Sequence, residues 1–376
     1  MTAHIIYYNY LTPDGSCMSL GGIQTYITNL IPVFKAKGYD VCIYQRSIVS
    51  FKAKANGADV IGIPFNCKHR KMLRGFRDIV LANADKDKDI IVFACDTTIQ
   101  DCAGYHTIAI QHGISWDKPC PNTGSSIRYY YDYIHMRYNA WRQIKRIEKV
   151  DQVVCVDYNF TNWYRAEVPF VKIKTNVVPN FCDIPCEIPQ KPQNKINIIF
   201  ARRLFEYRGT RIFANAIIRI LKEYSIVNVL VAGEGPDGPY LQEKLGNFKS
   251  VTFTRFESFE SLKIHSDKHI AVIPTIGSEG TSLSLLEAMA SGCAVIATNV
   301  GGMTNIVLDG YNGLLINPDE EDLCKAMKRL IDSEALRKQL AENAYDTAAS
   351  SFSLRIWRER WSMIISNIAM KNEKVP

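Results

Sequence analysis

Residues 270–298 read IAVIPTIGSEGTSLSLLEAMASGCAVIAT. The runs Ile270–Pro274 and Ala294–Thr298 are apolar and too short for helices, which predicts two buried strands. The segment Ser284–Ala290 between them has helical periodicity, and a loop of small residues precedes it. A strand, a helix and a second strand in this order predict a parallel pair joined by a crossover helix.

The same alternation of short apolar runs and helical segments continues through most of the chain. Further strands are predicted at His4–Asn9, Val41–Gln45, Ile90–Ala94, Thr107–Gln111, Gln152–Val156, Ile196–Ala201, Val227–Ala232, Val251–Thr254 and Leu314–Ile316. Helical periodicity is clearest at Thr25–Lys37 and Arg211–Tyr224. Strands that alternate with helices predict an α/β fold with doubly wound parallel sheets, buried on both faces.

The series is interrupted at residues 178–192, which contain four prolines and no periodicity. Such a segment is typical of a linker between domains. We therefore expect a first domain at 1–182 and a second at 183–353. The helical C-terminal segment 354–376 carries Trp357 and Trp361 four residues apart, and we expect these rings to pack back on the first domain.

Composition excludes several classes of protein. With 376 residues, 47% hydrophobic and 22% charged, the chain has the balance of a globular protein, which argues against disorder, collagen or a coiled coil. No apolar run reaches the length of a spanning helix, and the N-terminus lacks the pattern of a signal peptide. The eleven cysteines form no C-x-x-C pair. We expect reduced thiols and a cytoplasmic protein.

The net charge of +7 is unevenly placed. Two segments, Lys68–Arg77 and Arg128–Lys149, are dense in cations, and five tyrosines and Trp141 are interleaved with those of the second. Basic and aromatic residues together favour an anionic membrane surface, at the inner face of the plasma membrane, over nucleic acid. The alternative is a solvated helix face with its aromatic rings in the core.

Two features suit a phosphate group. Gly21 and Gly22 open a helix after the first strand, where backbone N–H groups and the helix dipole attract an anion; the alternative is a tight turn. Arg202, Arg203 and Arg208 follow the strand Ile196–Ala201, where arginine forks would meet phosphate oxygens; the alternative is a solvated loop.

The loop and helix of residues 275–290 carry the strongest signal. Glu279 lies in the loop and Glu287 within the helix, on either side of a helix N-terminus that can bind an anion. Phosphate and sugar hydroxyls in one pocket indicate a nucleotide sugar. By contrast, G-x-G-x-x-G at 233–238 contains Pro236 and is interpreted as a strand-to-helix turn. The acidic run 85–89 is interpreted as a solvated turn, and no metal site is expected.

These residues resemble the retaining glycosyltransferases of the GT-B fold, in the large Glu-x7-Glu family also called glycosyltransferase family 4 or glycosyl transferases group 1. The resemblance implies two Rossmann-like domains that face each other across a cleft, of which the first binds the acceptor and the second binds the nucleotide sugar. It implies that Glu279 contacts the donor sugar and Glu287 the ribose, and that Arg203 and Arg208 bind the diphosphate. Arg208 stands where the family has Lys, and Arg202 where it has Gly.

The resemblance also assigns residues outside this pair of glutamates. It implies a diphosphate loop at Gly21 and Gly22 and a histidine near the donor sugar at His112. Backbone groups of the helix start would hold the diphosphate, and Phe256 would lie by the base; the implied backbone set is Gly280, Thr281, Ser282 and Leu283. Asn305 replaces the acid that is usual in the family.

The implied activity is metal-independent, retaining transfer of a hexose from a nucleotide diphosphate sugar, with UDP slightly favoured over GDP or dTDP and with no separate cofactor. The acceptor would be a glycan or a lipid-linked glycan in bacterial surface polysaccharide assembly, such as O-antigen of lipopolysaccharide, capsule or exopolysaccharide. The catalytic residues would be His112, Glu279, Arg203 and Arg208. A non-catalytic subunit of an assembly complex, or another nucleotide-sugar enzyme such as an epimerase, are the alternatives.

Overall fold

The computed structural model describes residues 1–19, 21–65, 68–114, 116–117, 126–168, 170, 173–277 and 279–372. The chain forms two compact units. The first unit comprises Met1–His112, Asn122–Pro179 and Trp357–Pro376, and the second comprises Gly113–Pro121 and Asn180–Ile356. None of the described helices combines the length and the apolar character needed to cross a membrane.

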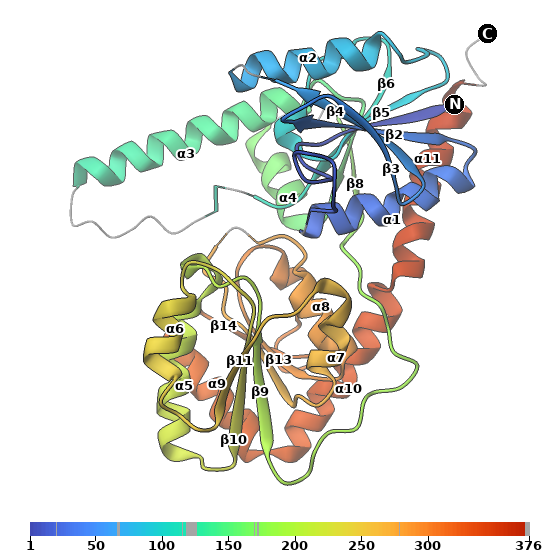
Figure 1. The fold of residues 1–376 in the computed structure, drawn as a ribbon. Helices are drawn as coiled ribbons and strands as arrows, with labels where there is room; N and C mark the ends of the chain where they lie inside the picture. The colour runs from blue at the N-terminus through green and yellow to red at the C-terminus, as the bar shows by residue number, and fades with distance from the viewer. Residues whose placement is uncertain are drawn as a thin grey trace. The chain divides into compact units, whose positions relative to one another are not determined.

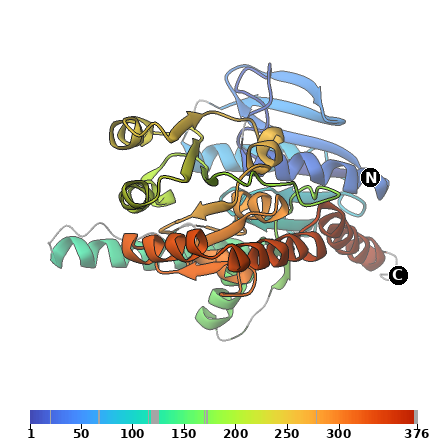
Figure 2. The same ribbon diagram turned by 90° about the horizontal axis from the view of Figure 1, so that it is seen from below.

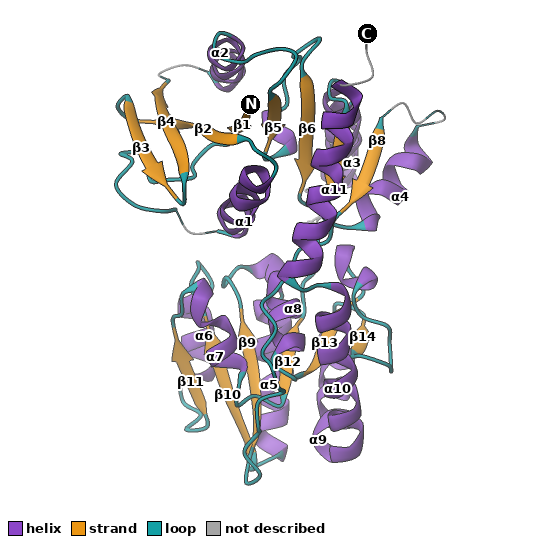
Figure 3. Cartoon of the chain, turned by 90° about the vertical axis from the view of Figure 1, so that its right-hand side faces the viewer, coloured by secondary structure: helices purple, strands orange, loops and turns teal. Residues whose placement is uncertain are grey.

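The first unit is built on one twisted sheet with helices beside it (Figures 1 and 3). Its elements are β1 (Thr2–Ile6), α1 (Gly22–Ala36), β2 (Asp40–Ser47), β3 (Phe51–Ala55), β4 (Ala58–Pro64), α2 (His69–Leu81), β5 (Ile90–Phe93), β6 (His106–Gln111), α3 (Ser126–Ile147), β7 (Gln152–Cys155), α4 (Tyr158–Glu167), β8 (Lys174–Val177) and most of α11 (Leu354–Asn372). Over the described residues the strand order is β3-β4-β2-β1-β5-β6-β7-β8. All these neighbours are parallel except β3 and β4.

The first sheet contains one antiparallel pair, the hairpin of β3 and β4, in addition to the predicted parallel strands. Ala55 pairs with Ala58, so Asn56 and Gly57 form a two-residue turn. Their φ angles are 51° and 80°. A turn with positive φ at both central residues matches the twist of a hairpin, and Asn-Gly is the dipeptide that adopts it most readily.

The C-terminal helix α11 packs on α1. Trp357 and Trp361 are buried, with ring centroids 4.9 and 6.1 Å from the ring of Tyr26. The indole N–H of Trp361 donates to the Tyr26 hydroxyl at 2.8 Å. The two tryptophans, one helical turn apart, therefore tie α11 to the first unit from Trp357 onward.

The second unit is a parallel sheet between two helical layers (Figures 1 and 2). Its elements are β9 (Ile196–Ala201), α5 (Thr210–Glu223), β10 (Val227–Ala232), α6 (Gly238–Leu245), β11 (Val251–Thr254), α7 (Ser261–His265), β12 (Ile270–Ile273), α8 (Leu283–Ala290), β13 (Ala294–Thr298), β14 (Leu314–Ile316), α9 (Glu320–Asp332) and α10 (Glu334–Ser351). The order is β11-β10-β9-β12-β13-β14.

Alternation along β9 separates the two layers of the core. Ile198 and Phe200 pack with residues of α5, α6 and α9, whereas Ile199 and Ala201 pack with residues of α8 and α10. Successive side chains of a strand point to opposite faces, so a strand buried on both sides is apolar at every position. This explains why β12 and β13, which are buried at every position, are continuous apolar runs.

Candidate functional site

The candidate site lies at the carboxyl ends of β9 and β12. These strands are parallel neighbours, with Ile198 opposite Ile270. Their carboxyl ends therefore meet at the same edge of the sheet, and the arginines that follow β9 lie beside the loop that follows β12. A backbone hydrogen bond from the Ile276 N–H to the Tyr207 carbonyl, at 3.0 Å, joins the two loops.

Glu279 is the centre of a buried polar cluster, with 9% of its surface exposed. Its Oε2 accepts hydrogen bonds from Arg202 Nη2 at 2.7 Å, from the Thr275 hydroxyl at 3.0 Å and from Arg208 Nη1. Arg202 also donates through Nη1 to the Thr275 hydroxyl at 2.6 Å. Among the described residues these three bonds to Glu279 all end on Oε2.

The charges of the cluster stabilise one another. Burial alone would raise the pKa of the Glu279 carboxyl, but Arg202 and Arg208 outweigh it and hold that pKa below its usual value. Burial lowers the pKa of Arg202 to about 10, although Glu279 acts in the opposite direction. For Arg208 the effect of Glu279 outweighs burial and raises the pKa. All three groups are therefore charged near pH 7.

Glu287 lies in α8 in a different environment. The Ser261 hydroxyl, from α7, donates to Glu287 Oε2 at 2.5 Å. Burial, with a smaller contribution from the charge of Asp183, raises the pKa of Glu287 to about 7, and the bond from Ser261 only partly offsets it. The two glutamates of the motif thus differ in charge near neutral pH.

The start of α8 is held by close backbone packing. Gly302 N–H donates to the Glu279 carbonyl at 3.0 Å, and a Cβ on Gly302 would lie 2.5 Å from the Gly280 carbonyl carbon. Asn180 Nδ2 donates to the Thr281 carbonyl at 2.7 Å. Ser282 is the N-cap and its side chain makes no capping bond, so the first N–H groups of α8, from Leu283 onward, can bind an anion.

The remaining predicted residues of the second unit lie around this cluster. Arg203 is exposed, with its guanidinium 5.8 Å from the Phe205 ring, whereas Arg208 is half-buried over Tyr207. Phe256 is half-buried against the core layer that contains α8. The structure thus brings Arg208 and Glu279 into contact and leaves Arg203 at the surface of the same loop.

Gly21, Gly22 and His112 belong to the first unit. Gly21 is the N-cap of α1 and Gly22 its first residue. His112 follows β6, and its Nε2 lies 2.9 Å from the Ala94 carbonyl, which can only accept; the proton is therefore on Nε2 and Nδ1 is an acceptor. Burial lowers the pKa of His112 to about 4, so the ring is neutral near pH 7.

Sequence reasoning missed the roles of Thr275 and Ser261, and it expected Arg202 to meet a phosphate group and did not expect it to pair with Glu279. The position of Arg202 directly after β9 was a usable signal, because the neighbouring strand brings Glu279 to the same edge. The contact between Ser261 and Glu287 depends on how α7 packs against α8, for which the sequence carries no signal.

Two other sequence motifs have structural roles. Residues 233–238 connect β10 to α6, which confirms their interpretation as a strand-to-helix turn. The glycines allow close backbone packing there, because a Cβ on Gly233 would lie 2.1 Å from the Arg202 carbonyl oxygen and one on Gly235 would lie 2.2 Å from that of Leu204. The interpretation of residues 85–89 as solvated was wrong for Asp89, which is buried and accepts from the Thr2 N–H at 2.6 Å and the Asp85 N–H at 2.9 Å. Within the described chain no three His, Cys, Asp or Glu side chains gather as metal ligands would.

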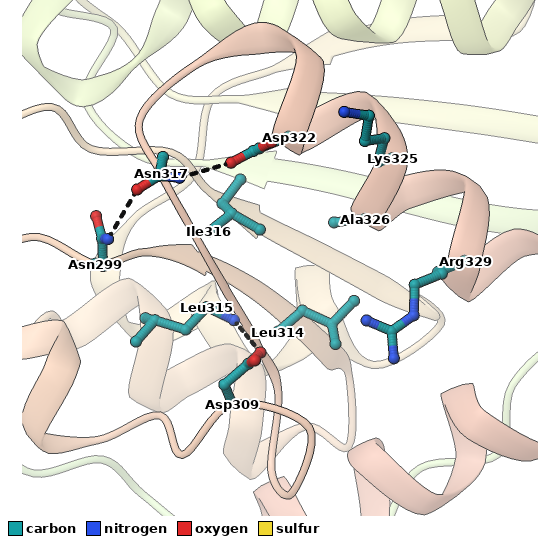
Figure 4. Close-up of a pocket in the computed structure, with 10 residues that line it drawn as sticks. All are labelled: Asn299, Asp309, Leu314, Leu315, Ile316, Asn317, Asp322, Lys325, Ala326 and Arg329. Atoms are coloured by element: carbon teal, nitrogen blue, oxygen red, sulfur yellow. Dashed lines mark hydrogen bonds between the residues drawn. The ribbon is translucent and has the colours of Figure 1, made fainter.

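A separate pocket of about 400 Å³ lies between β14 and α9 (Figure 4). Several of its polar groups are hydrogen-bonded to one another: Asp309 accepts from the Leu315 N–H at 2.9 Å, and Asn317 donates to Asp322 at 2.8 Å. It contains no residue of the Glu279 cluster.

Comparison with known proteins gives the fold and a family likeness. A family model described as glycosyl transferases group 1 matches residues 195–333. An uncharacterized glycosyltransferase of Methanocaldococcus jannaschii is 23% identical over 93% of this chain and 94% of its own. Sucrose-phosphate synthase from Thermosynechococcus elongatus has a TM-score of 0.76 at 14% identity, covering 98% of this chain and 99% of that one. Anabaena HepE in complex with UDP has a TM-score of 0.69 at 16% identity, covering 98% and 100%. The predicted α/β fold of the GT-B type is confirmed.

Proposed function

We propose, from the match of residues 195–333 to glycosyl transferases group 1 in a chain with the GT-B fold, that the protein is a retaining glycosyltransferase. It moves a hexose from a nucleotide diphosphate sugar to a glycan or lipid-linked acceptor. UDP is the favoured nucleotide, and the complex of the similar Anabaena protein with UDP supports this choice. The product is a bacterial surface polysaccharide or its lipid-linked precursor.

The observation that carries the proposal is Glu279, fixed by two arginines beside the start of α8. Its Oε1 accepts hydrogen bonds from hydroxyls of the donor sugar, while the N–H groups of the helix start hold the diphosphate. Glu287, further along the same helix, accepts from the ribose hydroxyls. The loop that carries Glu279 and the helix that follows it then position both ends of the donor.

The state of Glu279 favours a reaction without a covalent sugar–enzyme intermediate. A carboxylate that accepts three hydrogen bonds and faces two guanidinium groups is a weak nucleophile and a weak base. In the proposed step the bond from the anomeric carbon to the diphosphate oxygen breaks, and the acceptor oxygen bonds that carbon from the same face. The acceptor proton moves to the departing phosphate oxygen, so no protein base is required.

Positive charge in the second unit replaces a metal ion in this proposal. Arg202, Arg203 and Arg208 carry three positive charges against the single charge of Glu279, and the helix N-terminus adds a partial positive charge. Preorganised donors of this kind stabilise the charge that develops on the leaving diphosphate.

The proposal is tested by donor binding and slow donor hydrolysis in EDTA. UDP-glucose at about one hundred times its Kd should stabilise the protein by about 2.7 kcal/mol, with smaller effects of GDP- and dTDP-glucose at the same concentration. Hydrolysis to UDP and glucose should continue in EDTA. Activity that is lost on chelation and returns with magnesium or manganese would contradict metal independence. Binding without hydrolysis or transfer would favour a non-catalytic subunit, and conversion to an epimeric UDP-sugar would favour an epimerase.

Binding of UDP-glucose should strengthen as pH rises from 6 to 8. The pKa of Glu287 is raised to about 7, so at pH 6 the free protein carries a proton on this carboxyl. Ribose hydroxyls donate to the ionised carboxylate, so binding of the donor releases that proton. If only the protein with an ionised Glu287 binds UDP-glucose, Kd falls about tenfold from pH 6 to pH 8. Titration calorimetry at each pH measures it. Glu287→Gln should abolish the pH dependence, and Ser261→Ala should move its midpoint upward; a flat profile for the unaltered protein would contradict this role.

We also propose that the protein acts at the inner face of the membrane through α2. Lys68, Arg70, Lys71 and Arg74 are exposed, and within the described chain none of them pairs with a carboxylate. On α3, by contrast, Arg128, Arg137 and Lys145 pair with acidic residues. Helix α3 instead exposes the aromatic and apolar side chains Ile127, Tyr129, Tyr130, Tyr131, Tyr133, Ile134 and Tyr138, which suit the interfacial zone.

Vesicle sedimentation tests this surface. The triple variant Arg70→Glu, Lys71→Glu and Arg74→Glu should lose binding to anionic vesicles, since each basic residue near such a surface contributes about 1 kcal/mol. The control variant Lys222→Glu, Lys244→Glu and Lys249→Glu makes the same change in net charge on the second unit and should bind normally. Equal recovery with anionic and neutral vesicles, or none with either, would contradict the proposal.

A further inference from the structure

The first unit contains a pocket of about 720 Å³, within the usual size range of small-molecule sites. It lies where three neighbouring strands end, because the sheet order is β4-β2-β1. Tyr8 follows β1, Arg46 and Ser47 end β2, and Phe65 follows β4. The carboxyl edge of a parallel sheet is where ligands of α/β proteins bind.

The polar groups of this pocket suit an anion that accepts hydrogen bonds. Its lining contains no carboxylate, and Arg46 is exposed without a carboxylate partner among the described residues. Ser47 is only 6% exposed, and its Oγ has no hydrogen-bond partner in the part of the chain that the structure describes. A buried hydroxyl without a partner is unfavourable unless a ligand completes its bonding.

A hydrogen-bonded pair fixes the neighbouring wall. The Tyr8 hydroxyl donates to Thr97 Oγ1 at 3.1 Å and lies 2.9 Å from His69 Nε2, so the histidine N–H donates to the tyrosine. His69 is the first residue of α2, and its N-cap, Lys68, makes no side-chain capping bond. The first N–H groups of this helix and its dipole therefore add to the attraction of Arg46 for an anion.

Another part of the lining is apolar. Phe65 and Met72 line it, and Phe65 is supported by an edge contact with the ring of Phe76, with centroids 5.0 Å apart. An apolar, partly aromatic wall suits the C–H face of a sugar ring or the first part of an alkyl chain. The pocket thus offers a cation, hydroxyl donors and an apolar surface.

We infer that this pocket binds an acceptor sugar that carries a phosphate ester, with the phosphate at Arg46 and Ser47 and the ring against Phe65. The role of this sugar as the acceptor rests on the proposed function, whereas the binding of a sugar phosphate in this pocket does not depend on the transfer reaction. The same chemistry occurs in a soluble sugar phosphate and in a sugar linked through phosphate to a lipid.

The test uses the full chain with saturating UDP and measures binding of glucose 1-phosphate, glucose and inorganic phosphate by calorimetry. Glucose 1-phosphate should bind best. Arg46→Ala should weaken it about tenfold to hundredfold, the range for hydrogen bonds to a charged group. Ser47→Ala should weaken it about threefold to tenfold, yet leave the melting temperature of the free protein equal or higher, because it removes an unpartnered buried hydroxyl. Arg165→Ala, an exposed arginine of α4 outside the pocket, is the matched control.

The outcomes separate this inference from the proposed function. If Arg46→Ala binds glucose 1-phosphate normally and Arg203→Ala does not bind it, the phosphate lies in the second unit and the inference is overturned. Equal affinities for glucose and glucose 1-phosphate would also overturn it. Failure of UDP-glucose binding with intact glucose 1-phosphate binding would overturn the proposed function alone. If the octyl ester of glucose 1-phosphate binds tenfold more tightly than glucose 1-phosphate itself, the acceptor is lipid-linked. If the two bind with equal affinity, the acceptor is a soluble sugar phosphate.

Discussion

Replacing Glu279 by Gln is expected to lower the free energy of unfolding of the second unit by about 3–5 kcal/mol, the range for removing one partner of a buried ion pair. Arg202 is 8% exposed and would keep its charge without a counter-ion. Arg208 would face the same neutral amide. Urea unfolding at pH 6, followed by intrinsic fluorescence, measures the change.

The second glutamate of the motif is the matched control. Because the pKa of Glu287 is raised to about 7, its carboxyl is largely protonated at pH 6, and Gln has nearly the same shape and charge as that form. Glu287→Gln should therefore change stability at pH 6 by less than about 1 kcal/mol, the size of one ordinary hydrogen bond. Equal losses in the two variants would contradict the difference in charge state between the two glutamates.

The strands whose bounds sequence analysis predicted best belong to the second unit. β9, β10, β11, β13 and β14 have the predicted bounds. β13 lies inside the sheet and is buried at every position, so it is a continuous apolar run, whereas β11 lies at the edge and alternates apolar residues with threonine. The missed strands, β3, β4 and β8, lie at or next to the edges of the first sheet. In β3, Lys52 and Lys54 alternate with small or aromatic residues, which weakens the apolar signal. The Asn56-Gly57 turn was nevertheless readable as a hairpin.

The limits of the site prediction have a similar physical origin. The seven-residue spacing of Glu279 and Glu287 is local, so the sequence places one in a loop and the other on the helix that follows. The partner of Glu279 is remote in the sequence, since Arg202 is 77 residues away and meets it only because β9 and β12 are neighbours. Strand order follows from the whole topology, which one stretch of sequence does not contain.

Replacing Arg208 by Ala is expected to reduce turnover of UDP-glucose about 10²–10³-fold, as does loss of one preorganised donor to a developing negative charge. Folding should survive, because Glu279 keeps its bonds to Arg202 and Thr275. Arg203→Ala should give a similar loss with no effect on stability, since that side chain is exposed. Arg208→Lys retains the charge and should recover part of the rate.

The control for both variants is Arg211→Ala. Arg211 lies nearby at the start of α5, pairs with Glu206 at 3.3 Å and stacks on the ring of Tyr240, so it is an arginine already occupied away from the cluster. Its loss should leave turnover unchanged. Normal turnover in Arg203→Ala with a large loss in Arg208→Ala would restrict the diphosphate site to the buried arginines and remove Arg203 from it. Normal turnover in both would mean that the leaving group is stabilised elsewhere, because no other change to this loop removes as much positive charge while leaving Glu279 paired.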